Sequence, residues 1–286
     1  MGAAPRWRFA ATSVTGTSHV RSGGGCQDSY ATHVFDALEG PVLIVAVSDG
    51  AGSARAGAVG SALATGCVIE QAVAWLISGR RVGDIDVATA RDWLNGIREH
   101  IAEKAGEAES EMRDFAATLL FAVVSQTHSV FVQLGDGAIV VLTPEHEWSW
   151  VFWPMHGEYA NTTYFVTDDA SAKNLQFEAR PRPVREIAAF TDGLEPLVLE
   201  FKTKSAFQPF FGRMFRPLRA STVAGRDEQL SAQLTAYLRS PVITAKADDD
   251  LTLVMATTVD EAPIQPAQKA PHLTEMSDGR DGKPDN

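Results

Sequence analysis

The sequence has little of what marks a secreted, zinc-binding or nucleic-acid-binding protein. Cys26 and Cys67 are the only cysteines among 286 residues, too few for a disulfide framework or a typical zinc site. The formal net charge of −11 disfavours general binding to nucleic acid or to anionic membranes. Residues 1–8 lack the apolar core of a signal peptide, and no stretch approaches the roughly 20 continuous apolar residues that span a bilayer. We therefore expect a cytoplasmic protein with no nucleic-acid or membrane partner.

Apolar residues, by contrast, are plentiful. Hydrophobic residues make up 45% of the chain and charged residues 21%, which is enough for a sizeable core. We expect one folded domain over residues 1–259. From residue 260 onward the chain carries proline, lysine and aspartate without an apolar period, which predicts a disordered tail over residues 260–286.

Hydrophobic periodicity divides the domain into β-like and helical segments. We expect an early strand pair, a buried strand, two long helices and then a β-meander of three strands joined by hairpin turns. A loop-rich, aromatic insert over residues 145–185 precedes a further strand, three helices and a last strand. The expected strands cover residues 7–14, 30–35, 42–47, 115–124, 130–134, 138–142, 187–190 and 251–257; the expected helices cover residues 54–77, 85–108 (with Asp86 as N-cap), 194–201, 206–215 and 227–238.

Aspartates stand at the ends of five short apolar runs. Such a strand buries its apolar residues and delivers a carboxylate to a shared rim, where acids from distant segments can together hold hard divalent cations. Asp-Gly is also a favoured hairpin turn, and this alternative is strongest for Asp136, which lies between two expected strands. The acids, which predict a metal enzyme, are Asp28, Asp49, Asp136, Asp192 and Asp249.

Six short motifs surround these acids. In chain order they are Cys26-Gln27-Asp28-Ser29, Val47-Ser48-Asp49-Gly50-Ala51-Gly52, Phe115-Ala116-Ala117-Thr118, Leu134-Gly135-Asp136-Gly137, Phe190-Thr191-Asp192-Gly193 and Asp249-Asp250-Leu251-Thr252. Together they resemble the metal-dependent serine/threonine protein phosphatases of the PPM (type 2C) family, particularly its compact bacterial branch. The resemblance covers about residues 16–256, and it is specific because the motifs occur together in the family's order.

The resemblance implies an α+β fold, an αββα sandwich in which two packed antiparallel β-sheets are flanked by helical layers. It also implies a two-metal centre at one end of the sandwich, with the insert over residues 145–185 in the family's flap position. Asp49 would bridge both ions and the carbonyl of Gly50 would complete one of them. Asp192 and Asp249 would hold the second ion.

Two further acids have roles implied by the resemblance. Asp28 would act on metal-bound water from the outer shell, and Asp136 would support an optional third, weaker ion. Carboxylate and carbonyl ligands suit Mg²⁺ or Mn²⁺ better than zinc. Two such ions can provide a nucleophile at neutral pH and neutralise charge on a phosphoryl group.

The proton donor and the phosphate-binding residue follow less directly from the motifs. His19 is our candidate donor to the leaving alkoxide, with a plain surface or core role as the alternative. The family's phosphate-binding arginine is expected where Gly23 stands. Arg21 is our substitute, because a guanidinium matches phosphate bidentately, and a solvated surface arginine is the alternative.

Two other departures from the family pattern concern charge. Gln27 stands where relatives often have an acid, and it would contribute a carbonyl or remain outside the ligand set. Asp250 stands where asparagine is common. It would either strengthen cation binding beside Asp249 or lie in an exposed turn.

The leading hypothesis is a metal-dependent phosphatase that hydrolyses phosphoserine and phosphothreonine in proteins, acting as a monomer opposite a cognate Ser/Thr kinase. The rival is a non-catalytic, phosphoprotein-binding regulatory module with the same fold. A hydrolase of small phosphoesters or nucleotides is a third possibility. Retention of all five acids favours the active enzyme.

Overall fold

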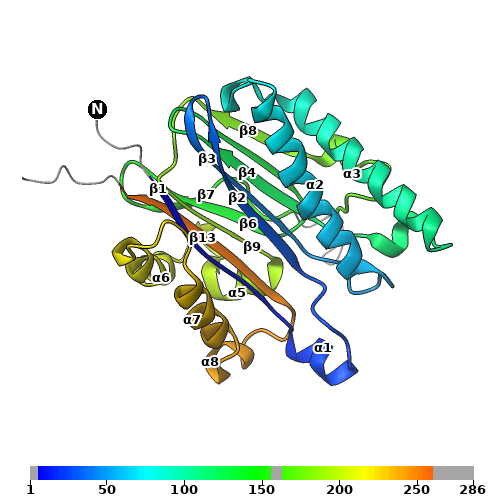
Figure 1. The fold of residues 1–286 in the computed structure, drawn as a ribbon. Coiled ribbons are helices and arrows are strands. Elements are labelled where there is room, and N and C mark those ends of the chain that lie inside the picture. The colour runs from blue at the N-terminus through cyan, green and yellow to red at the C-terminus, as the bar shows by residue number, and fades with distance from the viewer. Residues whose placement is uncertain (1–5, 156–162, 260–286) are drawn as a thin grey trace, which may run out of the picture.

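Two β-sheets lie face to face, and helices cover the outer side of each, in the computed structural model of the protein (Figure 1). The structure describes residues 6–155 and 163–259. The arrangement is the αββα sandwich that the resemblance implies, so the expected fold class is confirmed.

Sheet A has six strands and sheet B has five. Neighbouring strands run antiparallel, except that β12 and β1 are parallel. In spatial order, sheet A consists of β12 (Gly225–Arg226), β1 (Arg6–Val14), β13 (Leu251–Val259), β9 (Glu186–Phe190), β6 (Ala138–Leu142) and β7 (Trp148–Trp150). Sheet B consists of β2 (Ser29–Ala37), β3 (Gly40–Ser48), β4 (Leu119–Val124), β5 (Ser129–Leu134) and β8 (Gln176–Arg180), and a separate pair is formed by β10 (Leu199–Glu200) and β11 (Ser205–Ala206).

The helices form two layers. Sheet B is covered by α2 (Gly57–Ile77) and α3 (Val87–Glu107). Sheet A is covered by α5 (Glu195–Val198), α6 (Gln208–Ala220), α7 (Glu228–Leu238) and α8 (Pro241–Thr244). The remaining helical segments are α1 (Thr17–Ser22), α4 (Ser171–Asn174) and the 3₁₀ turns η1 (Val82–Asp84), η2 (Met112–Phe115) and η3 (Asp192–Leu194).

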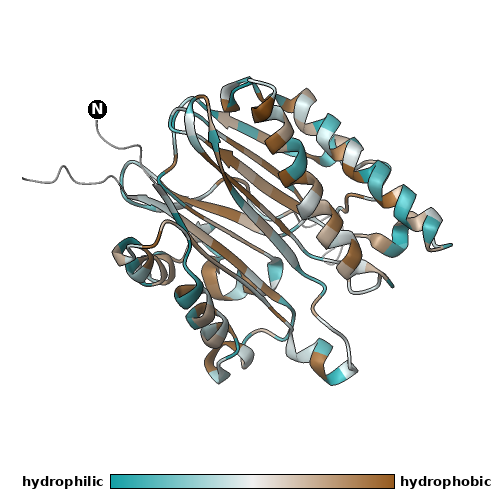
Figure 2. Cartoon of the chain, viewed as in Figure 1, coloured by the Kyte–Doolittle hydropathy of each residue, from teal (hydrophilic) through white to brown (hydrophobic). Residues whose placement is uncertain are grey.

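Strand β3 shows why the layers stack. Successive side chains of a strand point to opposite faces, so a strand buried on both faces is apolar throughout. Its even-numbered residues, Val42, Ile44 and Ala46, pack against α2 and α3. Its odd-numbered residues, Leu43, Val45 and Val47, pack against sheet A. Figure 2 shows hydrophobic residues along the strands of both sheets and hydrophilic ones along α3.

The expected strand pairs are only partly correct. The β4–β5 hairpin forms, but β5 and β6 do not pair, because the chain crosses from sheet B to sheet A between them and β6 pairs with β9 and β7. Likewise β1 pairs with β13 and β12, whereas β2 pairs with β3. A short turn sequence such as Asp136-Gly137 can occur both in a hairpin and where the chain crosses between sheets. Long-range strand pairing decides which of the two forms.

Helix boundaries agree closely with the periodicity. Asp86 is the N-cap of α3 as expected, since its carboxylate accepts a hydrogen bond from the Thr89 amide at 2.8 Å. The expected helix over residues 194–201 is shorter than predicted, ending at Val198 before β10. The insert over residues 145–185 contributes one strand to each sheet, β7 and β8. Its role as a flap stays a prediction, and the tail from residue 260 lies outside the described residues.

Helix α2 is apolar along most of its length. By length and composition alone Gly57–Ile77 could cross a membrane, although Glu70 and Gln71 interrupt its apolar run. One face of the helix packs against sheet B, and 44% of its most apolar window is buried inside the protein. A core helix of a sandwich meets the same length and composition test, and α2 occupies that position here.

Candidate metal centre

The predicted acids lie at one end of the sandwich because each adjoins a strand at that end. Asp49 follows β3, Asp136 lies in the crossing from β5 to β6, and Asp192 follows β9. Asp249 lies just before β13, and Asp28 just before β2. The pairing of Phe190 with both Ala138 and Leu253 aligns β6, β9 and β13 at this end.

Three of these carboxylates converge. One ligand oxygen from each of Asp49, Asp136 and Asp192 lies within 4.8 Å of the other two. We call these three residues the acid cluster. They come from both sheets, so the cluster exists only because the sheets are packed together.

Asp28 lies beside the acid cluster and is 9% exposed. Its Oδ2 accepts a hydrogen bond from the Thr191 hydroxyl at 2.7 Å. Its Oδ1 is buried and has no hydrogen-bond partner among the described residues. A buried oxygen left in this state normally faces an ion or a water.

Burial raises the pKa of Asp28, Asp49 and Asp192. Burial, with Asp250 as a neighbouring charge, raises the pKa of Asp28 to about 6. Burial and then Asp136 and Asp249 raise the pKa of Asp192 to about 7, and burial with Asp28 and Asp192 raises that of Asp49 well above its usual value. Within the described ranges no lysine or arginine forms an ion pair with Asp28, Asp49 or Asp192. The negative charge is therefore left for a cation to neutralise.

Glu195 is a further acid at this site that the motifs did not indicate. It is 4% exposed, and burial together with Asp192 and Asp136 raises its pKa to about 9. Its spacing of three residues after Asp192, at the start of α5, was the available signal, because residues i and i+3 share a face of a helical turn.

The backbone around Asp49 is fixed from the neighbouring strand. Thr118 accepts a hydrogen bond from the Asp49 amide through its hydroxyl at 2.9 Å and donates its own amide to the Asp49 carbonyl at 2.8 Å. Gly50 forms an isolated β-bridge with Ala117, and a Cβ at Gly50 would lie 2.5 Å from the backbone of Gly57. The glycine is required there because the chains approach too closely for any side chain.

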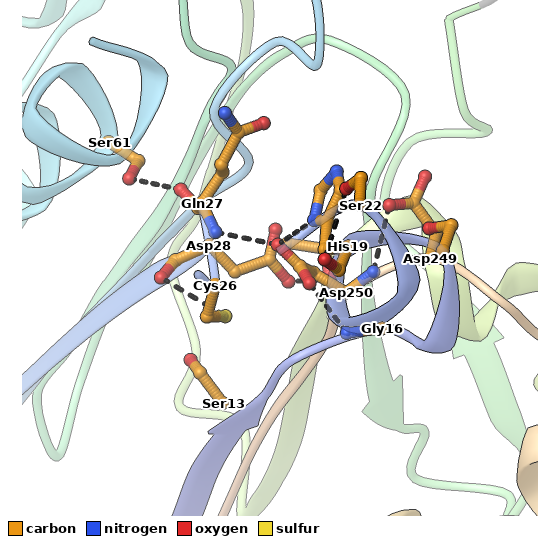
Figure 3. A network of polar contacts seen from close by, with 12 residues as sticks. Ser13, Gly16, His19, Ser22, Cys26, Gln27, Asp28, Ser61, Asp249 and Asp250 are labelled. Atoms are coloured by element: carbon orange, nitrogen blue, oxygen red, sulfur yellow. Dashed lines mark hydrogen bonds and ion pairs between the residues drawn. The ribbon is translucent and has the colours of Figure 1, made fainter. Parts of the chain in front are cut away.

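Asp249 belongs to a second group beside the acid cluster. Ligand atoms of His19, Asp249 and Asp250 lie within 4.8 Å of one another, and Figure 3 shows the three side chains together. Asp249 is exposed, whereas Asp250 is 2% exposed. The expectation that Asp250 lies in an exposed turn is therefore wrong.

Comparison with known proteins agrees with this geometry. The sequence pattern described as Protein phosphatase 2C matches residues 15–239. The chain belongs to the protein phosphatase 2C family. It is 35% identical over 254 residues to Serine/threonine-protein phosphatase 3 of Escherichia coli (strain K12), a match that covers 87% of this chain and 98% of that protein. The expected family and enzyme class are confirmed.

Solved structures of phosphatases share the fold of this 2C-type phosphatase. The catalytic domain of the serine threonine protein phosphatase PstP, solved in complex with two manganese ions, superposes with a TM-score of 0.59 at 18% identity, covering 90% of this chain and all of that one. The serine/threonine phosphatase Stp1 of Staphylococcus aureus gives a TM-score of 0.55 at 16% identity, covering 90% and 96%.

The residues of this 2C-type phosphatase fit hard divalent cations. The ligand atoms at the acid cluster are carboxylate oxygens, and neither Cys26 nor Cys67 lies in a group of possible ligands among the described residues. Oxygen-only ligands favour Mg²⁺ or Mn²⁺ over zinc. The unpaired Oδ1 of Asp28 and the raised pKa values of Asp49 and Asp192 also fit a site that binds a cation.

Arg21 lies on the surface of α1. Its guanidinium is 3.7 Å from the carboxylate of Asp248, and both side chains are exposed, at 71% and 75%. Its predicted contact with substrate phosphate stays a prediction. Gln27 contributes its backbone to the site, since its carbonyl accepts hydrogen bonds from Gly50 and Ser61 at 3.2 and 2.5 Å.

Proposed function

We propose that this 2C-type phosphatase hydrolyses phosphoserine and phosphothreonine in proteins with the help of Mg²⁺ or Mn²⁺ ions held at the acid cluster. The observation that carries the proposal is the convergence of Asp49, Asp136 and Asp192 from three distant segments, together with the pKa values of Asp49 and Asp192, which burial and neighbouring carboxylates raise. Family membership and the 35% identity to a serine/threonine phosphatase support it.

In this proposal Asp49 would serve both ions, the Gly50 carbonyl would complete one of them, Asp192 and Asp249 would hold the second, and Asp136 would support a weaker third. When bound, such ions lower the pKa of a water molecule and neutralise charge on the phosphoryl oxygens. Oxygen ligands and retained waters suit Mg²⁺ and Mn²⁺, and few protein ligands per ion are needed.

The other candidate residues act on the substrate and on water. Asp28, held by the Thr191 hydroxyl, orients the attacking water through its unpaired Oδ1. His19 is the candidate donor of a proton to the leaving alkoxide. Arg21, exposed on α1, is the candidate contact for substrate phosphate.

The test is hydrolysis of p-nitrophenyl phosphate and of a phosphothreonine peptide by the full chain, with Mn²⁺ titrated in and then chelated. We expect Mn²⁺-dependent turnover of both, and a loss of about 1,000-fold in Asp49→Asn because charge stabilisation by the metal contributes several kcal/mol. Asp169→Asn, at an exposed aspartate, is the matched control.

Three outcomes of this test would contradict the proposal. Metal binding without turnover would favour the non-catalytic phosphoprotein-binding module. Faster hydrolysis of free nucleotides than of phosphopeptides would favour the small-phosphoester hydrolase. Equal activity of Asp49→Asn and Asp169→Asn would remove the acid cluster from the chemistry.

We also propose that the protein is a cytoplasmic monomer that opposes a Ser/Thr kinase. Light scattering of the purified chain checks the oligomeric state, and fractionation of cells checks the compartment. Dephosphorylation of a protein first phosphorylated by a Ser/Thr kinase checks the partnership.

A further inference from the structure

Asp250 fastens three separate segments at the metal end of the sandwich. Its Oδ1 accepts a hydrogen bond from the Gly16 amide at 2.6 Å, and its Oδ2 accepts one from the Gln27 amide at 2.6 Å. Nδ1 of His19 lies 2.9 Å from the same Oδ2 (Figure 3). We call this arrangement the Asp250 clamp. It joins β13 to the start of α1 and to the segment that carries Asp28.

The clamp requires a carboxylate rather than an amide. Both oxygens of Asp250 face backbone N–H groups, and the side chain is only 1% exposed, so water does not share these contacts. An asparagine of the same shape would turn its NH₂ group against one of the two amides, and a buried donor facing a donor is costly.

Asp250 also makes an ion-pair contact with Nδ1 of the His19 ring. With Nδ1 against Asp250, the other ring nitrogen, Nε2, is the polar atom left for a ligand, and the side chain is 23% exposed. The backbone of α1 is held as well, because Ser18 donates its amide and hydroxyl to the Asp248 carbonyl at 2.8 and 2.6 Å. His19 therefore lies fixed beside Asp249, at the edge of the candidate metal centre.

We propose that Asp250 is a positioning residue that holds His19 so that Nε2 gives a proton to the leaving oxygen of the substrate. The proposal rests on the proposed function. The oxygen of water bonds to phosphorus as the bond from phosphorus to the serine or threonine oxygen breaks. The serine or threonine oxygen keeps the electron pair of the broken bond and takes the proton from Nε2. The proton released by the attacking water then restores His19.

Two substrates that differ only in their leaving group test this role. Phenyl phosphate needs a proton on its leaving oxygen more than p-nitrophenyl phosphate does, because p-nitrophenolate is a stable anion. We expect His19→Ala to lower kcat for phenyl phosphate by about 100-fold while p-nitrophenyl phosphate loses less than about threefold, since a general acid contributes about 10²–10⁴-fold.

Asp250→Asn should shift the same ratio by about tenfold, as loss of an orienting partner does, and the double variant should match His19→Ala. Ser22→Ala is the control on the same helix, because its exposed hydroxyl donates to the backbone carbonyl of His19 at 3.0 Å and forms no hydrogen bond with the His19 ring among the described residues. Thermal unfolding is recorded for each variant. If Asp250→Asn does not fold, Asp250→Ser is measured in its place.

The outcomes separate this inference from the function on which it rests. No turnover of either substrate by the wild-type chain would overturn the proposed function. An active wild type in which His19→Ala slows both substrates equally would overturn the proton-donor role. A selective loss in His19→Ala without one at Asp250 would leave His19 active and overturn the positioning role.

Discussion

Two groups of acids lie side by side at the same end of this molecule and differ in what faces them. The acid cluster holds Asp49 and Asp192, whose pKa values are raised by burial and by neighbouring carboxylates. In the Asp250 clamp, the single carboxylate is met by two backbone amides and an imidazole. The same residue type therefore serves two purposes, and the number of N–H donors nearby decides which.

The difference has a structural cause. Asp49 follows a strand that pairs with β2 and β4, and its own amide donates to the Thr118 hydroxyl. Gly16 and Gln27 lie in the loops around α1, where the amides have no strand partner and turn toward Asp250. A buried carboxylate that accepts hydrogen bonds from amides holds segments of the chain together. A buried carboxylate that faces other carboxylates needs a cation to neutralise its charge.

Replacing one acid from each group should give opposite changes, and this is the largest expected effect. Asp192→Asn should raise the Tm of the metal-free protein because it removes a repelling charge, while losing the rise in Tm on adding Mn²⁺ and about 1,000-fold in turnover. Asp250→Asn should lower the metal-free Tm because it leaves buried amides poorly matched. Scanning fluorimetry with and without Mn²⁺ measures both. Equal shifts in the two variants would remove the distinction between the groups.

The next largest effect is expected at Gly16, whose amide donates to Asp250 in the Asp250 clamp. A Cβ at Gly16 would lie 2.2 Å from the carbonyl carbon of Asp249 and 2.5 Å from the carbonyl oxygen of Asp248, both of them backbone atoms. We expect Gly16→Ala to lower the free energy of unfolding by about 3 kcal/mol, the upper part of the range for overpacking. Gly25→Ala, on the other side of α1, is the control, since nothing lies within 4 Å of a Cβ there. Urea unfolding compares them, and equal stabilities would show that α1 is not fastened.

The smallest expected effect is the pH dependence of the metal-free protein. The pKa of Asp28 is raised to about 6 and that of Asp192 to about 7, so the folded state holds protons that the unfolded chain has released. The free energy of unfolding should therefore fall as the pH rises from about 4 to about 7.

Calorimetry in the presence of a chelator checks this dependence. We expect the Tm to be a few degrees lower at about pH 7.5 than at about pH 5, corresponding to about 1–2 kcal/mol. Saturating Mn²⁺ should abolish the decrease, and Asp192→Asn should reduce it. A metal-free Tm that rises over this interval would contradict the assignment of unneutralised acids.

Local patterns predicted much of this fold. The alternating residues of Val42–Val47 required a strand buried on both faces, and the apolar period placed α2 and α3 within a few residues. The crossing at Asp136 was beyond such reasoning. Whether an Asp-Gly turn closes a hairpin or passes the chain to another sheet depends on which strand receives β6, and that strand, β9, lies about 50 residues further on.

The candidate site divides in the same way. The motifs indicated Asp28, Asp49, Asp136, Asp192 and Asp249 as acids at the ends of apolar runs, and the structure brings three of them within 4.8 Å of one another. Glu195 was missed because it belongs to no strand end and reaches the site through the turn after Asp192. The motifs also left open whether Asp250 is exposed or faces a cation, because its amide partners are more than 200 residues away in the chain.

The sequence by itself determined the family, the alternation that builds two sheets, and the acids carried to the strand ends, because these depend on residue type and short spacing. Only the tertiary structure decided which acid stays unneutralised and which is satisfied. That choice depends on where free N–H groups lie around each carboxylate, and packing of the two sheets and of α1 brings those groups from distant parts of the chain.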